Sequence, residues 1–341
     1  MRKLISMTKD ASIYEAYANI NTGFDEIIEV GKLPNTSDIG TTSYLTSSVR
    51  ILLNFATDST WPSSAEYFLN LKIARGIDVK NSQQLIVGAI SQSWDEGSGY
   101  FYQQPFNKDD GATWNSASMS TTWPSPGGYL NTSTTASYTI ESYPIEDIRI
   151  NVTNIMQPII SGSIPFYGLY IKFPTEDEQD SRNSGLIKFF ATQTHTVHQP
   201  KLEVVWASQA FATGSLKRLP LDSPISITSN ALISQYEQGT IEKIRLIVRD
   251  KFPDRAFNTN MRFANKYYLP SESYYRVVDI TTGVGYGEFD QYNAIDCDAT
   301  GSYFVLNTNP LYKNKEYAVE IKYLHNGNER YSALPSHFIV R

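Results

Sequence analysis

The chain has 341 residues and a hydrophobic fraction of 41%, so it is long enough for two domains and too apolar for an intrinsically disordered protein. No apolar run approaches the ~18 residues that a membrane-spanning helix needs, so we expect no membrane span. The 35 acidic residues outnumber the 29 basic ones and no basic stripe is present, so we expect no direct binding to nucleic acid.

Two further features bear on the compartment in which the chain folds. The first residues, MRKLISMTKDA, include basic side chains but no apolar stretch after them, so we expect no signal peptide. The single cysteine, Cys297, rules out a disulfide framework within the chain. Both observations favour folding in a reducing cytosol.

The first two hundred residues predict many short strands separated by turn formers. Tyr67–Ile73 is the clearest of them, because every second residue is apolar and would share one face. Val152–Ser161 is the best helix candidate, and Pro158 should limit it to a turn or two. Such a series favours a jelly roll over a βαβ fold. The other extended segments are expected at Ile13–Val30, Val49–Phe55, Gln84–Ser91, Ala136–Ile140, Ile148–Val152, Tyr167–Phe173, Leu186–Phe190 and Lys201–Trp206.

One long segment between these strands, Ser93–Gly128, stands apart, and we call it the tryptophan loop. It holds three of the five tryptophans, Trp94, Trp114 and Trp123, among frequent Gly and Pro residues that exclude a helix. A flexible linker has no use for three indoles, so we expect an ordered loop across one end or face of a sandwich. The three indoles are candidates for contact with a glycan or for anchoring the loop.

The motifs of this loop also resemble a known family. The order Trp-Asp-Glu-Gly, Asp-Gly-Ala-Thr-Trp and Trp-Pro-Ser-Pro-Gly-Gly is similar to the DNRLRE-type (disaggregatase-related) carbohydrate-binding-like module. Asp10–Lys32, Val49–Phe55 and Lys188–Trp206 follow in the order of that family, so the resemblance covers about the first two hundred residues. It implies a jelly-roll-like β-sandwich of the kind found in surface polysaccharide enzymes and in virion proteins of tailed bacteriophages.

The second part of the chain predicts a smaller β-sandwich. Ala207–Pro224 changes in composition and is expected to be a linker, which leaves residues 1–206 and 225–341 as the two domains. Ile241–Arg249 alternates apolar and charged residues and predicts one strand. Asn326-Gly327 predicts a hairpin turn. The remaining strands are expected at Ser273–Asp279, Tyr303–Asn307, Tyr317–Tyr323 and His337–Arg341, and the pattern is typical of an immunoglobulin-like sandwich.

This part has a resemblance of its own. The segments YYRVVDITTG, EFD and AIDCDATGSYFVLNTNPLYKNKEYAVEIKY are similar to the C-terminal immunoglobulin-like domain of phage structural proteins. A jelly roll followed by such a domain is an arrangement associated with virions, which the resemblance therefore implies for this chain.

No motif in the sequence points to catalysis. The pair His195 and His198 would project to opposite faces of a strand and would not chelate one ion. Neither a G-x-S-x-G elbow nor a P-loop is present. Cys297 lies between two aspartates, which would raise its thiol pKa rather than activate it. We therefore expect no enzymatic activity and no catalytic, cofactor-binding or metal-binding residue.

Calcium is the one ligand that the acidic residues leave open. The run Glu176–Asp180 lacks the spacing of an EF-hand loop, so a solvated loop is the favoured interpretation. Four acids of the tryptophan loop could also offer oxygen ligands, and the sequence does not decide between these roles: Asp95, Glu96, Asp109 and Asp110.

Two functional hypotheses follow. The leading one is a structural protein of a tailed-bacteriophage virion, in the neck, head–tail connector, tail or fibre, made in the bacterial cytoplasm and contacting copies of itself and other virion proteins. Its motivation includes 23 tyrosines, a residue favoured at protein interfaces. The alternative is a carbohydrate-binding module for surface attachment or host recognition, which predicts that Trp94, Trp114 or Trp123 is exposed.

Overall fold

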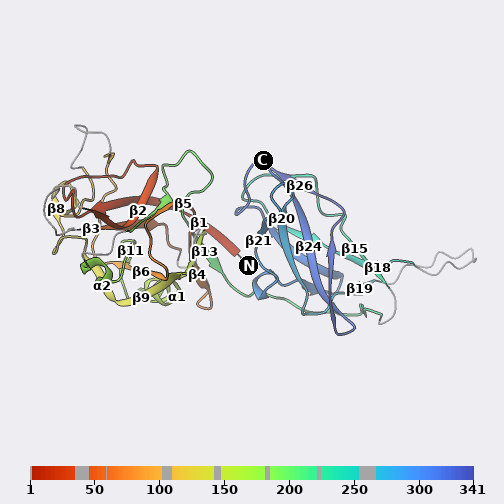
Figure 1. Cartoon of the computed structure of the whole chain (residues 1–341). Coiled ribbons are helices and arrows are strands. Elements are labelled where there is room, and N and C mark those ends of the chain that lie inside the picture. The colour runs from red at the N-terminus through yellow and green to blue at the C-terminus, as the bar shows by residue number, and fades with distance from the viewer. Residues whose placement is uncertain are drawn as a thin grey trace, which may run out of the picture. The chain divides into compact units, whose positions relative to one another are not determined.

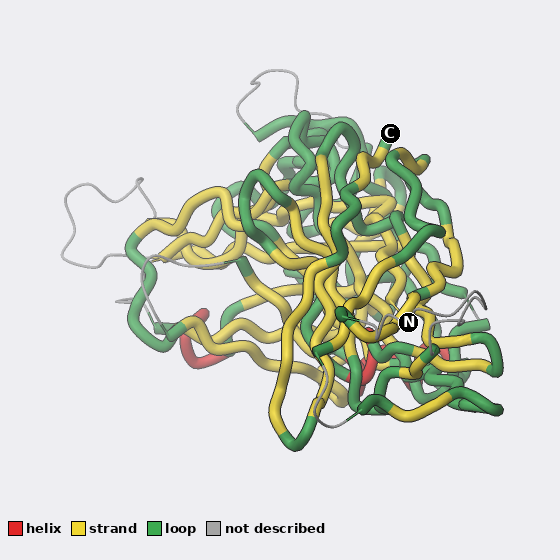
Figure 2. The backbone as a smooth tube through the Cα atoms, turned by 90° about the vertical axis from the view of Figure 1, so that its right-hand side faces the viewer, coloured by secondary structure: helices red, strands yellow, loops and turns green. Residues whose placement is uncertain are grey.

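The computed structural model describes residues 2–34, 46–58, 60–101, 110–141, 147–180, 185–220, 224–252 and 266–341 (Figure 1). Strands predominate and the helices are short (Figure 2). The chain divides into two compact units. We call Leu4–Val204 the N-terminal unit, and Val205–Arg341 together with Arg2 and Lys3 the C-terminal unit.

The N-terminal unit is a β-sandwich with two short helices. Its strands follow one path of hydrogen-bonded neighbours, β10-β4-β13-β1-β3-β11-β6-β9, from which β2, β12 and β5 branch at β3. The elements are β1 (Arg2–Tyr14), β2 (Ile27–Pro34), β3 (Thr46–Phe55), β4 (Glu66–Leu71), β5 (Ile73–Ile77), β6 (Gln83–Ile90), β7 (Ser116–Ser118), β8 (Thr121–Thr122), β9 (Leu130–Ile140), β10 (Ile148–Asn151), α1 (Thr153–Ile160), β11 (Leu169–Lys172), α2 (Thr175–Gln179), β12 (Gly185–Phe190) and β13 (Lys201–Val205).

The alternation of apolar residues along β4 shows which face of this strand packs into the core of the unit. Tyr67, Leu69 and Leu71 of β4 are buried, as the sequence predicts. The strand is shorter than expected, however, because β4 ends at Leu71 and β5 begins at Ile73. The two strands pair with different partners, β4 with β10 and β5 with β12, so the chain changes neighbours at this break.

A glycine allows β2 to change partners within its length. Gly31 pairs with Leu186 of β12 and with Val49 of β3, and its φ of +143° is a conformation that side chains rarely adopt. A Cβ here would lie 2.0 Å from the carbonyl oxygen of Gly185. The branch of the sheet at β3 therefore depends on a residue without a side chain.

The C-terminal unit is a second, smaller sandwich. A six-stranded sheet, β16-β26-β24-β20-β21 with β25 on β24, accompanies the three-stranded sheet β17-β23-β22 and the pair β15-β18. Its elements are β14 (Lys217–Arg218), β15 (Ile225–Thr228), β16 (Gln235–Tyr236), β17 (Ile241–Arg245), β18 (Ile247–Asp250), β19 (Tyr267–Tyr268), β20 (Tyr274–Asp279), β21 (Gly285–Tyr286), η2 (Gln291–Asn293), β22 (Asp296–Asp298), β23 (Gly301–Asn307), β24 (Glu316–His325), β25 (Asn328–Ala333) and β26 (Phe338–Val340).

The segment predicted as one strand, Ile241–Arg249, changes sheets in its middle. The face of Ile244, Leu246 and Val248 is buried, as the alternation predicts. The backbone nevertheless divides at Leu246, so that β17 pairs with β23 and β18 pairs with β15. The amide of Leu246 donates to the carbonyl of Ser302 at 2.9 Å, so the backbone NH at the point where the strand divides has a hydrogen-bond partner.

The expected linker, Ala207–Pro224, is part of the C-terminal unit in its described portion. Its strand β14 pairs in parallel with β19, and Leu219 is buried in the core. Phe211 forms a bridge with Cys297. The segment reads as polar in sequence, but its partners lie far along the chain, which is why composition alone suggested a linker. Residues 221–223 lie outside the described residues.

The all-β class predicted from the sequence is confirmed, and both units are β-sandwiches. The predicted helix is α1, two turns long with Pro158 inside it. The hairpin at Asn326-Gly327 joins β24 to β25, and both turn residues have the positive φ that this turn requires. None of the helices in the described part of the chain has the length and apolar character needed to span a bilayer.

Candidate functional site

The tryptophan loop is organised around one buried amide. Asn21, fully buried, donates from Nδ2 to the carbonyls of Glu96 at 2.7 Å and Ala112 at 2.9 Å, and its Oδ1 accepts from the amide of Gly99 at 2.8 Å. Both described arms of the loop are therefore fastened to the turn that precedes β2. A Cβ on Gly99 would lie 2.4 Å from the carbonyl oxygen of Asn21, which explains a glycine at this position.

The three tryptophans of the loop are core residues. Trp94, Trp114 and Trp123 are 2%, 7% and 5% exposed and form one apolar cluster with residues of β1, β3, β6 and β11. The indole NH of Trp94 donates to the carbonyl of Tyr167 at 2.8 Å, and that of Trp123 to the carbonyl of Thr113 at 2.9 Å. Each of these two buried NH groups thus has a partner.

The burial of the three indoles decides between the two roles expected for them, contact with a glycan and anchoring of the loop. A ring that is at most 7% exposed offers no free face on which a sugar could stack. The indoles therefore anchor the loop, because their rings pack against the strands of the sandwich. The loop also contains a short hairpin, β7–β8, that its Gly- and Pro-rich composition did not indicate.

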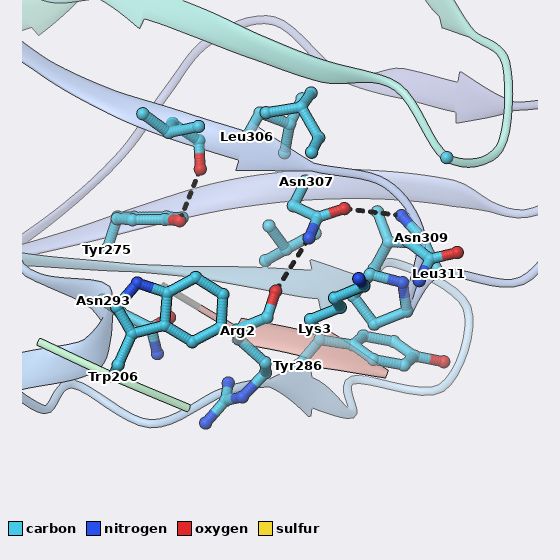
Figure 3. Close-up of a pocket in the computed structure, with 15 residues that line it drawn as sticks. Arg2, Lys3, Trp206, Tyr275, Tyr286, Asn293, Leu306, Asn307, Asn309 and Leu311 are labelled. Carbon is cyan, nitrogen blue, oxygen red and sulfur yellow. Dashed lines mark hydrogen bonds between the residues drawn. The ribbon is translucent and has the colours of Figure 1, made fainter. Parts of the chain in front are cut away.

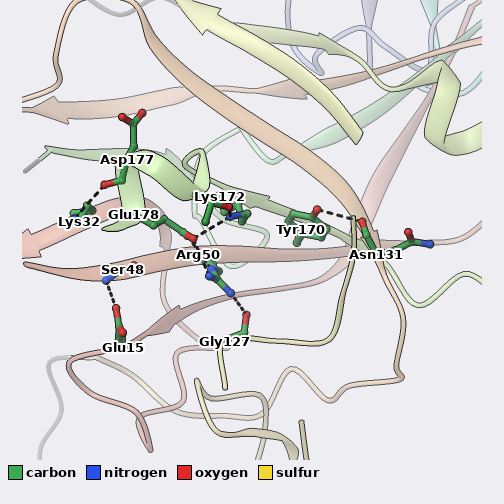
Figure 4. Close-up of polar contacts among 11 residues, drawn as sticks. Glu15, Lys32, Ser48, Arg50, Gly127, Asn131, Tyr170, Lys172, Asp177 and Glu178 are labelled. Atoms are coloured by element: carbon green, nitrogen blue, oxygen red, sulfur yellow. Dashed lines mark hydrogen bonds and ion pairs between the residues drawn. The ribbon is translucent and has the colours of Figure 1, made fainter. Parts of the chain in front are cut away.

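An ion-pair network fixes the far end of the loop (Figure 4). The guanidinium of Arg50 lies 4.8 Å from the ring centroid of Trp114 and donates to the carbonyl of Gly127 at 2.7 Å. It also donates through Nε and Nη2 to both carboxylate oxygens of Glu178, at 2.9 and 2.8 Å. Lys172 donates to the same carboxylate at 2.9 Å. Glu178 therefore binds both Arg50 and Lys172, and its role is structural.

The acidic run Glu176–Asp180 is only in part the solvated loop that the sequence favours. Its residues lie in and just after α2, so the run is mostly helical; Glu176 and Gln179 are exposed, as a solvated run predicts, whereas the side chain of Glu178 is only 6% exposed. Asp177 pairs with Lys80 and accepts from Gln83 at 3.0 Å. Within the described parts of the chain, no group of three or more acidic, His or Cys side chains could hold a metal ion.

The acids of the tryptophan loop serve as acceptors for backbone amides. Glu96 accepts from the amide of Asp10 at 3.0 Å, and Asp110 accepts from the amide of Ser98 at 2.9 Å. Asp95 forms a 3.9 Å ion pair with Lys9. Asp109 lies outside the described residues. These carboxyls are therefore distributed along the loop and do not converge on one point.

Two of the loop's contacts involve carboxyl groups with raised pKa values. Asp10 is 1% exposed; its Oδ2 accepts from the amide of Thr192 at 2.6 Å, while Oδ1 finds no hydrogen-bond partner among the described residues. Burial raises the pKa of Asp10 to about 7, and the nearby Glu96 adds to the shift. Burial also raises the pKa of Asp25, which accepts from the amide of Phe101, to about 6.

The other candidates from the sequence do not form a site. His195 is 89% exposed and lies 3.4 Å from Glu26, whereas the His198 ring lies against Phe190 with centroids 5.3 Å apart. Cys297 is buried, and burial, with a contribution from Asp298, raises its thiol pKa. Such a thiol is a poor nucleophile at neutral pH.

Four aromatic side chains that sequence reasoning missed line the outside of the loop, and we call them the aromatic rim: Tyr17, Phe24, Tyr100 and Phe101. Tyr17, Phe24 and Tyr100 are 42%, 40% and 36% exposed. The Phe24 ring contacts that of Tyr100 at 5.8 Å between centroids, and the Tyr17 ring meets Phe101 edge-on at 5.3 Å. The sequence could have indicated these residues by their position. Tyr17 and Phe24 lie on either side of the turn at Asn21, and Tyr100 and Phe101 directly follow Gly99.

A backbone hydrogen bond joins the two segments that carry Phe24 and Tyr100. The amide of Phe24 donates to the carbonyl of Gly99 at 3.0 Å, so the two chain segments that present the rings are joined directly. Exposed apolar rings on a fixed scaffold are typical of surfaces that bind a partner. The rim is therefore the candidate functional surface of the N-terminal unit.

Comparisons with known proteins add little to this picture. No protein-family model matches the sequence, and no curated protein is similar to it. One solved structure with weak similarity is β-glucuronidase 3 of Bacteroides uniformis, at 10% identity and a TM-score of 0.22, over 100% of this chain and 35% of that one. Another is a putative β-galactosidase of Bacteroides fragilis, at 9% identity and a TM-score of 0.18, over 98% and 41%. This chain spans less than half of either protein, and TM-scores this low support no argument about fold or activity.

Proposed function

We propose that this chain is a structural protein of a tailed-bacteriophage virion, in the neck, head–tail connector, tail or fibre, and that it acts by protein–protein contact within a multimer. In this proposal the chain is made in the cytoplasm of the bacterial host and catalyses no reaction. The observation that carries the proposal is the aromatic rim, a group of partly exposed rings on a β-sandwich. The resemblance of both halves of the sequence to phage modules supplies the setting.

The chemistry of the rim favours a protein partner over a glycan. Sugar sites need converging polar groups for the hydroxyls. Two carboxyls that contact the segment carrying Tyr100 and Phe101 already accept backbone amides, Asp25 from Phe101 and Asp110 from Ser98. Aromatic side chains are enriched in protein interfaces, where they bury large area at low entropic cost. A glycan contact at the same rings is the second candidate, and the test below includes it.

The test combines particle analysis with solution assembly of the full chain. We expect mass spectrometry to find the chain in purified virions, and native mass spectrometry to show a multimer of the isolated protein. The double variant Phe24→Ser/Tyr100→Ser should dissociate that multimer, whereas Tyr331→Ser, which removes a more exposed ring from the C-terminal unit, should not.

Three outcomes count against the proposal. Absence of the chain from intact particles would refute the virion assignment. A multimer unaffected by the double variant would refute the role of the rim. Binding on a glycan array that the double variant abolishes, with no self-association, would favour the carbohydrate-binding alternative.

A further inference from the structure

The C-terminal unit contains a cavity that neither proposed function uses. Its volume is about 370 Å³, within the range of small-molecule sites. All of its lining residues belong to this one unit. Strands β20, β21 and β23 and the loop after β23 supply most of the wall, and the start of β1 closes it (Figure 3). The ring-bearing residues of the wall are Trp206, Tyr275 and Tyr286, and the aliphatic ones include Val277, Val305, Leu306 and Leu311.

The start of β1 is fastened into this wall. The side-chain amide of Asn307 donates to the carbonyl of Arg2 at 2.7 Å. Gly287, with φ +86°, leaves room for the guanidinium, because a Cβ there would lie 2.1 Å from Nη1 of Arg2. The position of Arg2 beside the cavity is thus built by two residues of the C-terminal unit.

Most polar groups of the wall already have partners. The hydroxyl of Tyr275 donates to the carbonyl of Val305 at 2.7 Å. The Oδ1 of Asn307 accepts from the amide of Asn309 at 3.0 Å, and the Nδ2 of Asn293 donates to the carbonyl of Glu288 at 2.6 Å. A hydroxyl-rich ligand such as a sugar would therefore leave its own polar groups unpaired against an apolar wall.

The charged residues among those that line the cavity are both basic. Arg2 and Lys3 line it, and no acidic side chain of the described residues does. This is notable in a chain with a formal charge of −6. A wall of aromatic and aliphatic groups beside two cations is complementary to a ligand with an apolar body and one negative charge.

We propose that this cavity binds a small amphipathic anion, namely an aromatic or branched apolar body that bears a single carboxylate. The body would lie against Trp206 and the side chains of β20 and β23. The carboxylate would pair with Arg2 or Lys3. The cavity would thus couple a free metabolite-sized acid to the C-terminal unit.

The test uses 2-naphthoate with two analogues of the same body, 2-naphthalenemethanol and 2-naphthylmethylammonium. Trp206 is the sole tryptophan among residues 205–341, so fluorine NMR of the full chain labelled with 5-fluorotryptophan reports on the cavity. Trp206→Phe assigns its resonance. We expect 2-naphthoate to shift this resonance saturably, the alcohol to bind about tenfold more weakly and the ammonium not to bind.

Variants separate the two halves of the proposal. Arg2→Gln/Lys3→Gln should weaken 2-naphthoate about tenfold and leave the alcohol unchanged. Val305→Phe should fill the cavity and abolish binding of both, and Arg249→Gln, an exposed cation outside the cavity, should have no effect. Near-ultraviolet circular dichroism confirms that each variant is folded. Equal affinity for acid and alcohol would overturn the charge assignment, and an unmoved Trp206 resonance at millimolar ligand would overturn the site.

Discussion

The two units place acidic side chains under opposite electrostatic conditions. In the N-terminal unit, burial raises the pKa values of Asp10, Asp25 and Glu96, so these groups favour the protonated form. In the C-terminal unit, Arg245 and Lys243 lower the pKa of Asp298 at hydrogen-bond distances of 2.6 to 2.8 Å, so this group favours the ionised form. Asp296 is an exception, since burial raises its pKa.

The difference teaches that surroundings, and not residue type, set the sign of the pH dependence. Asp10 has a folded-state pKa of about 7 against an ordinary value of 3.8, so its contribution to stability is full in acid and is lost as the pH rises towards 7. Asp298 has a lowered pKa, so its contribution is present above its ordinary value and is lost as the pH falls. Hydrogen exchange of the full chain, read from peptides of each unit, can measure both trends.

The largest expected effect tests burial in the N-terminal unit. Trp94→Ala should lower its unfolding free energy by about 3–5 kcal/mol, because a filled core site becomes a cavity and the carbonyl of Tyr167 loses its donor. Met119→Ala, at an 80% exposed position of the same loop, should change it by less than about 0.5 kcal/mol. Equal protection in peptides of both variants would contradict the anchoring role.

The second prediction concerns the buried carboxyl. Asp10→Asn keeps an oxygen for the amide of Thr192 and removes the charge, so it should stabilise the N-terminal unit by about 2–4 kcal/mol at pH 8 and hardly at all at pH 4. Asp95→Asn, whose side chain is 63% exposed, should leave stability unchanged at both values. Destabilisation by Asp10→Asn at pH 8 would show that the carboxylate has a partner there.

The third prediction compares two ion pairs of the N-terminal unit that differ in the exposure of their arginine. Arg50→Met should cost about 2 kcal/mol, less than the ~3–5 kcal/mol of a fully buried pair, because it leaves Glu178 with Lys172 alone. Arg149→Met removes one partner of Glu203, which also accepts from Asn70 at 3.2 Å, from a 45% exposed position and should cost under about 1 kcal/mol. Chemical denaturation of the two variants gives the comparison, and similar losses would argue against burial as the deciding factor.

The smallest effect is expected in the C-terminal unit. Asp298→Asn should lower its unfolding free energy by about 1 kcal/mol or less at pH 7, since Asp298, Lys243 and Arg245 are 34%, 45% and 32% exposed. The deficit should shrink as the pH falls below about 4 and should vanish only near the lowered pKa of the folded-state carboxyl, where the wild-type group also becomes neutral. A deficit that is as large at about pH 2.5 as at pH 7 in hydrogen exchange would break the contrast between the units.

Local chemistry made part of this structure predictable. Alternation identified the buried faces of Tyr67–Leu71 and Ile244–Val248, and Asn326-Gly327 identified a hairpin. The anchoring of the described parts of the tryptophan loop followed from its indoles. These features depend on residues close together in the sequence, where the side-chain period and turn preferences act directly.

Features that depend on distant partners were not predictable in the same way. The alternation of Ile241–Arg249 runs on through Leu246, where the strand changes sheets, because β15 and β23 and not the segment itself decide the pairing. Ala207–Pro224 joins the C-terminal unit through two residues of β14 and their partners in β19. The aromatic rim and the cavity likewise arise only when separate loops meet.

The hydrogen bond between Asn307 and Arg2 spans 305 positions of sequence and has a consequence for synthesis. Arg2 leaves the ribosome long before Asn307 is translated, so the beginning of β1 must wait without its final neighbour while Leu4–Val204 is already complete. The contact between Arg2 and Asn307 therefore forms only after most of the given sequence has been synthesised.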